Sequence, residues 1–149
     1  MGEKLKNNKL KAEFELVKHL MPDVINSKLE IVKFKPEAII NSLLLETDAT
    51  HAEAVLITLE VIRKIISSNL STLTAPLIRE LVNATMLTKG FELYRYQYTR
   101  LGIPFYDFGK KLNSENVSSD DIYNHLKREY VEVQKLIDKI KKQGTQKGK

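Results

Sequence analysis

One segment that is apolar on nearly every side constrains this chain more than any other feature. It runs from Ala54 to Ile66, and its apolar members are Val55, Leu56, Ile57, Leu59, Val61, Ile62, Ile65 and Ile66. Only a helix surrounded by other helices can bury so many apolar side chains. Thr50-x-x-Glu53, just before it, is a capping-box signature for a helix N-terminus. The sequence therefore predicts a helical domain with this segment at its centre.

Further helices are indicated on both sides of this segment. Leu10, Phe14, Val17 and Met21 recur at helical spacing, and Pro22 should end that helix. Another helix should begin at Pro36, and a third should follow Thr74 as its N-cap and end at Gly90. A short helix is expected over about 91–100, and a long amphipathic one over 120–140.

The β-prone pairs Val24-Ile25 and Ile31-Val32 flank the turn-forming residues 26–28 and predict a short hairpin. No other segment gives a convincing strand signal. We therefore expect a mainly α (α+β) fold, a bundle of five to six helices with a small N-terminal β-hairpin.

At 149 residues the chain suits one domain with a substantial core. The expected organisation is a basic N-terminal extension (1–12), a folded domain (13–109) with an aromatic C-terminal segment (91–108), a connector (110–119), an amphipathic C-terminal helix (120–142) and a disordered basic tail (143–149).

The net charge of +5 is concentrated in the two ends, because the first twelve residues carry +3 and the last eleven carry +5. Residues 13–138 are therefore net −3. Basic ends of this kind keep a protein in solution or touch nucleic-acid phosphates weakly. No apolar run is long enough for a membrane span, and the charged N-terminus does not resemble a signal peptide. With no cysteine in the chain, we expect a cytoplasmic protein without membrane contact.

No residue pattern predicts a catalytic or metal site. His19, His51 and His125 lack partners at metal-ligand spacing, and glycine-rich phosphate loops and a Gly-x-Ser-x-Gly elbow are absent. A cysteine nucleophile is excluded by composition. The chain is therefore not expected to be an enzyme on its own.

Three lysines, Lys28, Lys33 and Lys35, cluster on the expected hairpin and its exit. A phosphate could be held there between strand ends and a helix N-terminus. Together with Asn26 and Thr74 they are the candidate nucleotide-binding residues. As solvated surface charges, the lysines would need no function.

Seven of the eleven aromatic residues lie between Phe91 and Phe108. Aromatic residues this dense either close one end of a small core or offer a platform to a partner. The candidate partner-docking residues in this run are Tyr94, Arg95, Tyr98, Arg100 and Tyr106.

The strand pair, followed by Phe34, Pro36-Glu37-Ala38-Ile39 and three helices with Ile78-x-x-x-Val82 in the last, resembles the ATP-cone. This family is a small nucleotide-binding regulatory module of ribonucleotide reductases and of a repressor of their genes. The run Tyr94-Arg95-x-x-Tyr98-Thr99-Arg100-Leu101-Gly102-Ile103-Pro104-x-Tyr106-Asp107 is similar to the segment after the cone in archaeal-type anaerobic ribonucleoside-triphosphate reductases. The resemblance extends through Asp121-Ile122-Tyr123 and Arg128-Glu129-Tyr130. It implies ATP or dATP, with magnesium, as the ligand.

The chain departs from the family at the phosphate contacts. Asn26-Ser27-Lys28-Leu29 stands where cones carry Lys-Arg-x-Gly, and a second family lysine falls on Ala38. Each missing charged hydrogen bond is worth about 1.5–3 kcal/mol, so binding should be weak. The cysteines and glycyl-radical barrel of the reductases are absent as well.

Three hypotheses follow. The first is a stand-alone, degenerate ATP-cone-like module that binds a purine nucleoside triphosphate weakly, or docks on a ribonucleotide reductase or another protein. The second is a nucleic-acid binder that uses Arg95, Gln97 and Arg100, against which the acidic body of the chain argues. The third is a structural remnant of a split reductase, which would self-associate or pair with the catalytic chain.

Overall fold

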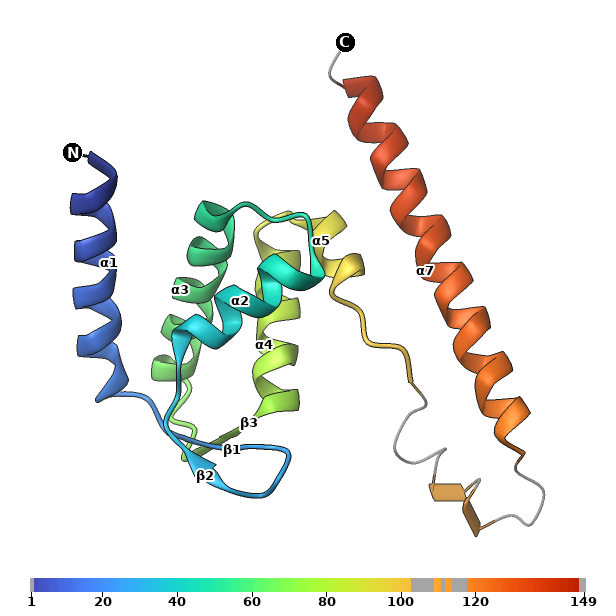
Figure 1. Cartoon of the computed structure of the whole chain (residues 1–149), viewed down its shortest axis with the longest axis horizontal. Helices are drawn as coiled ribbons and strands as arrows, with labels where there is room; N and C mark the ends of the chain where they lie inside the picture. Colours follow the sequence, from blue (N-terminus) through green and yellow to red (C-terminus); the bar gives the residue numbers. More distant parts are fainter. Residues whose placement is uncertain (1, 103–108, 111, 114–117, 148–149) are drawn as a thin grey trace. The chain divides into compact units, whose positions relative to one another are not determined.

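The computed structural model describes residues 2–102, 109–110, 112–113 and 118–147 (Figure 1). Its elements are α1 (Gly2–Lys18), β1 (Asp23–Ile25), β2 (Ile31–Val32), α2 (Pro36–Glu46), α3 (His51–Ser67), β3 (Thr72–Thr74), α4 (Ala75–Thr88), α5 (Glu92–Gln97) and α7 (Ser119–Lys147). The chain divides into two compact units, residues 1–92 and 93–149. The predicted mainly helical fold with a small amount of β-structure is confirmed.

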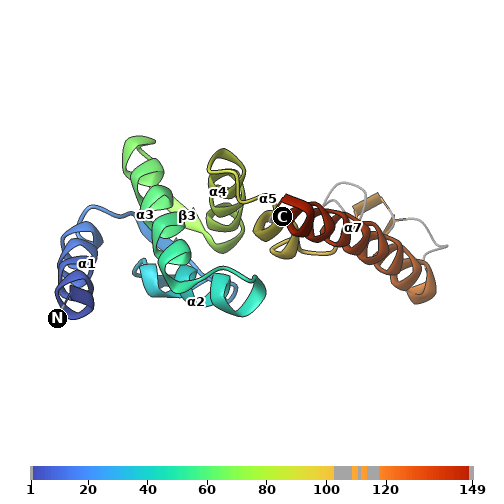
Figure 2. The same cartoon turned by 90° about the horizontal axis from the view of Figure 1, so that it is seen from above.

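Helix α3 is the centre of the first unit, as its all-round apolar pattern predicts. It packs against both α2 and α4, which lie beside it in Figure 2. Its buried residues are Ala54, Val55, Ile57, Thr58, Val61, Ile62 and Ile65. The remaining core comes mainly from α2 and α4, and from Phe34 and Leu73 next to them. The polar Thr58 is tolerated at the centre because its hydroxyl donates to the Ala54 carbonyl at 2.7 Å.

Three predicted helix ends, at Thr50, Thr74 and Gly90, are confirmed. The Thr50 hydroxyl accepts from the Glu53 amide, and the Glu53 carboxylate accepts from the Thr50 amide, so the capping box is complete. The Thr74 hydroxyl accepts from the Leu77 amide at the start of α4. Gly90, with a φ of 79°, ends α4 in the left-handed conformation that glycine adopts at low cost.

The β-structure is larger than the sequence predicts. The hairpin forms with Val24 opposite Val32, and a third strand, β3, pairs parallel with β1. The strand order is therefore β2-β1-β3. This third strand was missed because residues 72–74 become a strand only by pairing with residues 23–25, which are distant in sequence.

The hairpin turn is held by the side chain of Asn26. Its Oδ1 accepts from the amides of Lys28 and Glu30, both at 2.9 Å. Leu29 takes the left-handed position of the turn with a φ of 64°, where a side chain with a Cβ is strained. The expected turn at residues 26–28 is confirmed and extends to Glu30.

Both long terminal helices reach further than expected. Helix α1 begins at Gly2, within the segment 1–12 expected to be an extension. Helix α7 continues to Lys147, so residues 143–147, expected to be a disordered tail, are helical. Lysines near a helix C-terminus interact favourably with the helix dipole. None of the described helices is long and apolar enough to cross a membrane.

Candidate functional site

The strand register separates the five candidate nucleotide-binding residues into two groups. Strands β1 and β3 are parallel, with Ile25 opposite Thr74, so Asn26 and Thr74 lie at the same end of the sheet. The hairpin turn places Lys28 at that end too. Lys33 and Lys35 follow Val32 at the opposite end, where α2 begins. At about 3.3 Å per strand residue, the two groups are roughly 10–15 Å apart along the hairpin.

The second group is a pair of exposed cations fixed by one buried side chain. Phe34 is 4% exposed and anchors the connection between β2 and α2, whereas Lys33 and Lys35 on either side of it are exposed. In an extended segment successive side chains point to opposite faces, so the two lysines share the face opposite Phe34. Lys35 is extended and is the N-cap residue of α2. Among the described residues, neither lysine has a carboxylate within 4.0 Å.

A third lysine, which the sequence analysis did not identify, lies near the start of α2. Lys18 Nζ is 3.9 Å from Glu37 Oε1 in the first turn of α2, and 3.0 Å from Glu15 Oε1. The hydrogen bond to Glu15 raises the pKa of the Lys18 ammonium, and the charge of Glu37 adds to this. Lys18 belongs to α1, far from the start of α2 in sequence, so only the packing of α1 could reveal this proximity.

At the other end of the sheet, two of the three candidates already have structural roles. The Asn26 amide oxygen accepts both turn amides, and its Nδ2 donates to Glu30 Oε2 at 3.0 Å. The Thr74 hydroxyl caps α4 at 3.3 Å. Lys28 is exposed and forms no ion pair within the described part of the chain. This end therefore offers one cation, against two at the start of α2.

The candidate docking residues differ in accessibility. Tyr98 is only 4% exposed, which agrees with the expectation that the aromatic run could close a core. Tyr94 and Arg95 are half-buried, and Arg95 Nη1 donates to Thr99 Oγ1 at 3.1 Å. Arg100 is exposed, and Tyr106 lies outside the described residues.

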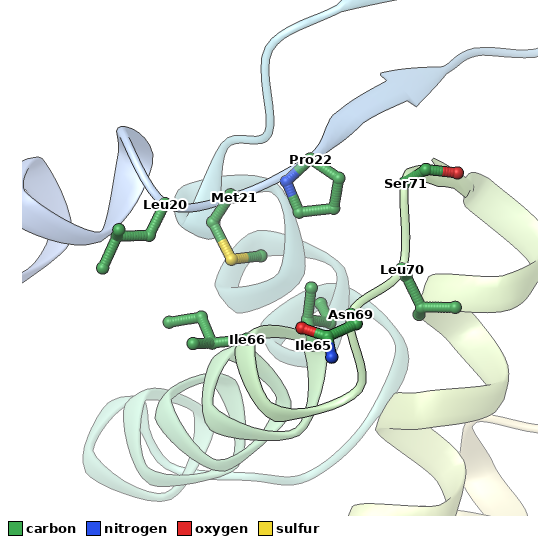
Figure 3. Close-up of a pocket in the computed structure, with 8 residues that line it drawn as sticks. All are labelled: Leu20, Met21, Pro22, Ile65, Ile66, Asn69, Leu70 and Ser71. Atoms are coloured by element: carbon green, nitrogen blue, oxygen red, sulfur yellow. The ribbon is translucent and has the colours of Figure 1, made fainter.

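None of these residues lines a depression of about 350 Å³ in the first unit (Figure 3). Its lining residues are Leu20, Met21, Pro22, Ile65, Ile66, Asn69, Leu70 and Ser71. The Met21 side chain extends over the last turn of α3. None of the lining residues is ionisable, so the depression lacks the side chains needed for acid–base chemistry.

Among the described residues, no group of three or more His, Cys, Asp or Glu side chains could hold a metal ion. Comparison with family models, curated proteins and solved structures finds no match to this chain.

Proposed function

We propose that this chain is an ATP-cone-like regulatory module, which binds the phosphates of ATP or dATP, with magnesium, at the start of α2. The observation that carries the proposal is the pair Lys33 and Lys35, which share one face opposite the buried Phe34 and have no carboxylate partner among the described residues. The order of a strand pair followed by α2, α3 and α4 is the order on which the ATP-cone resemblance rests.

The charges at the start of α2 suit an oligophosphate better than a singly charged ligand. Two ammonium groups on one face can contact different phosphates of the same chain, and the N-terminus of α2 adds a partial positive charge. Lys18 supplies a third cation if its contact with Glu37 is exchanged for a phosphate.

Carboxylates close to the start of α2 oppose phosphate binding. Glu37 lies in the first turn of α2, and continuing the hairpin register puts Asp23 opposite Lys33. Repulsion from these acids, together with the missing family lysines, makes millimolar to high-micromolar affinity the expectation. Magnesium should strengthen binding because it lowers the charge that the phosphates present to Glu37 and Asp23.

Calorimetric titration with MgATP and MgdATP tests the proposal. We expect Lys33→Ala/Lys35→Ala to weaken binding at least tenfold, since each charged contact is worth about 1.5–3 kcal/mol before solvent screening. Lys9→Ala/Lys11→Ala, on α1, is the matched control because it removes the same charge from two other exposed lysines. Lys28→Ala should cost less, because Lys28 lies at the far end of the hairpin.

Equal losses in the Lys33/Lys35 and Lys9/Lys11 variants would mean that ATP responds to net charge and not to a site. Absence of heat at millimolar nucleotide would end the nucleotide-binding proposal and leave docking on a protein partner. The candidate docking residues give the protein-docking alternative less support, because Tyr98 is buried and Arg95 forms a hydrogen bond with Thr99. The nucleic-acid hypothesis also gains no support, since α5, which carries Arg95 and Gln97, has only six residues.

A further inference from the structure

Helix α7 carries a coiled-coil stripe. Six of the nine Ile, Leu, Val and Tyr residues of α7 recur at alternating spacings of three and four, as the a and d positions of heptads do: Tyr123, Leu126, Tyr130, Val133, Ile137 and Ile140. The average spacing of about 3.5 residues keeps all six on one side of a helix that runs without a break from Ser119 to Lys147.

This stripe is incompletely covered in the structure. Tyr123 is 65% exposed and Tyr130 is 56% exposed, although both belong to the stripe. Within the described part of residues 93–149, the Gly102 amide donates to Glu129 Oε2 at 2.9 Å. That contact lies on the flank of the stripe, and the other four stripe residues, Leu126, Val133, Ile137 and Ile140, are half-buried. An amphipathic helix of this length gains stability mainly by burying such a surface.

The charges of α7 are distributed unequally along its length. Residues 119–132 carry a net charge of −2, from Asp120, Asp121, Glu129 and Glu132 against Lys127 and Arg128. Residues 133–144 carry +3, from Lys135, Lys139, Lys141 and Lys142 against Asp138. Two such helices attract each other only when they run in opposite directions, because a parallel pair would align like charges.

We propose that α7 is a self-association surface, on which α7 of a second copy of this chain packs antiparallel. When the two stripes overlap completely, their residues pair in three kinds of layer across the interface. Each kind occurs twice because of the two-fold symmetry. Tyr130 packs against Val133 of the second copy, Leu126 against Ile137, and Tyr123 against Ile140. The acidic half of each helix then faces the basic half of the other. This proposal does not depend on nucleotide binding.

Sedimentation velocity over a concentration series of the full chain tests the surface. We expect a reversible monomer–dimer equilibrium that Tyr130→Asp shifts at least tenfold towards monomer, because it places a charge in the central layer. Asn124→Asp adds the same charge on the same helix, at an exposed position outside the stripe, and should leave the equilibrium unchanged. A monomer at every concentration, or a dimer that Tyr130→Asp does not weaken, would overturn the proposal.

The orientation can be tested with single cysteines, because the natural chain has none. In an antiparallel pair, a mixture of Tyr123→Cys and Ile140→Cys chains forms a disulfide-linked heterodimer on mild oxidation, and neither variant efficiently links to itself. Self-linked Tyr123→Cys dimers at the expense of the heterodimer would show a parallel pair and refute the charge argument. Asp120→Lys/Asp121→Lys should weaken the antiparallel dimer, and increasingly so at low salt. Unchanged dimerisation of the Asp120→Lys/Asp121→Lys variant would also contradict the charge argument for the antiparallel orientation.

Discussion

Helices α3 and α7 are both rich in apolar residues, but they belong to units that differ in how they bury them. Apart from Tyr98, every buried apolar side chain of the described residues lies within residues 1–92. In α7, Tyr123 and Tyr130 remain more than half exposed although they share a stripe with Ile137 and Ile140. The first unit therefore contains its own hydrophobic core, whereas the stripe of α7 is buried only in part among the described residues.

The comparison shows that an apolar pattern indicates which face of a helix must be buried. It does not indicate which element covers that face. Helix α3 is apolar on nearly all sides and is packed between α2 and α4 of its own unit. Helix α7 is apolar on one side only, and a one-sided stripe can be satisfied by a single partner helix. Each of the following substitutions tests one side of this contrast.

The largest effect should come from opening a cavity in the first unit. Leu43 in α2 is fully buried, so Leu43→Ala should lower the free energy of unfolding by about 2–5 kcal/mol. Leu45→Ala makes the same truncation two residues further along, where the side chain is 86% exposed. That control should cost less than about 0.5 kcal/mol. Urea denaturation followed by circular dichroism compares the two. Similar losses would mean that α2 is not packed as described.

A smaller loss is expected at the ion pair that joins α2 to α4. Arg79 Nη2 and Nη1 donate to the two carboxylate oxygens of Glu46 at 2.9 and 3.2 Å. Because this contact is bidentate and Arg79 is largely buried, Glu46→Ala should destabilise the first unit by about 1–2 kcal/mol. Arg63→Ala breaks the exposed pair with Glu60 and should cost about 0.5 kcal/mol or less. If Glu46→Ala and Arg63→Ala lower the thermal stability equally, the Glu46–Arg79 pair does not stabilise the contact between α2 and α4.

One substitution in the hairpin should stabilise the protein. Leu29 is 85% exposed and left-handed, so Leu29→Gly removes strain without losing a packed side chain. We expect a gain of about 1 kcal/mol in unfolding free energy. Ser27→Gly, in the same turn, has no such strain to relieve and should not stabilise. Loss of stability in the Leu29→Gly variant would show that the turn does not adopt this conformation.

The smallest effect on the first unit should come from α7. Ile137→Ala removes part of the stripe, but at concentrations where the chain is monomeric it should change the stability of residues 1–92 by less than about 0.5 kcal/mol. Amide exchange of α3 in the variant measures this directly. A loss comparable to that of Leu43→Ala would mean that α7 completes the core of the first unit.

Local features of the sequence predicted much of the fold. The centre at α3 follows from its all-round apolar pattern, and its capping box depends on two residues three positions apart. Strand β3 was missed because its evidence is non-local: residues 72–74 become a strand only by pairing with residues 23–25. The end of α7 at Lys147 was missed because its polar composition was interpreted as a tail.

The candidate site was less predictable for the same reason. Lys28, Lys33 and Lys35 are close in sequence, but the hairpin register carries Lys28 to the opposite end of the sheet. Lys18 is distant in sequence from α2, and its 3.9 Å contact with Glu37 depends on how α1 packs. Sequence proximity identified the cations but could not assign them to one site.

Hydrogen–deuterium exchange of the full chain at several protein concentrations tests the contrast between the two units most directly. We predict that the amides of α3 exchange slowly and at the same rate at every concentration, because the core of residues 1–92 is complete within one chain. The amides of α7 should exchange faster at low concentration and become protected as the concentration rises. Equal protection of α7 at all concentrations would contradict the account, as would protection of α3 that depends on concentration.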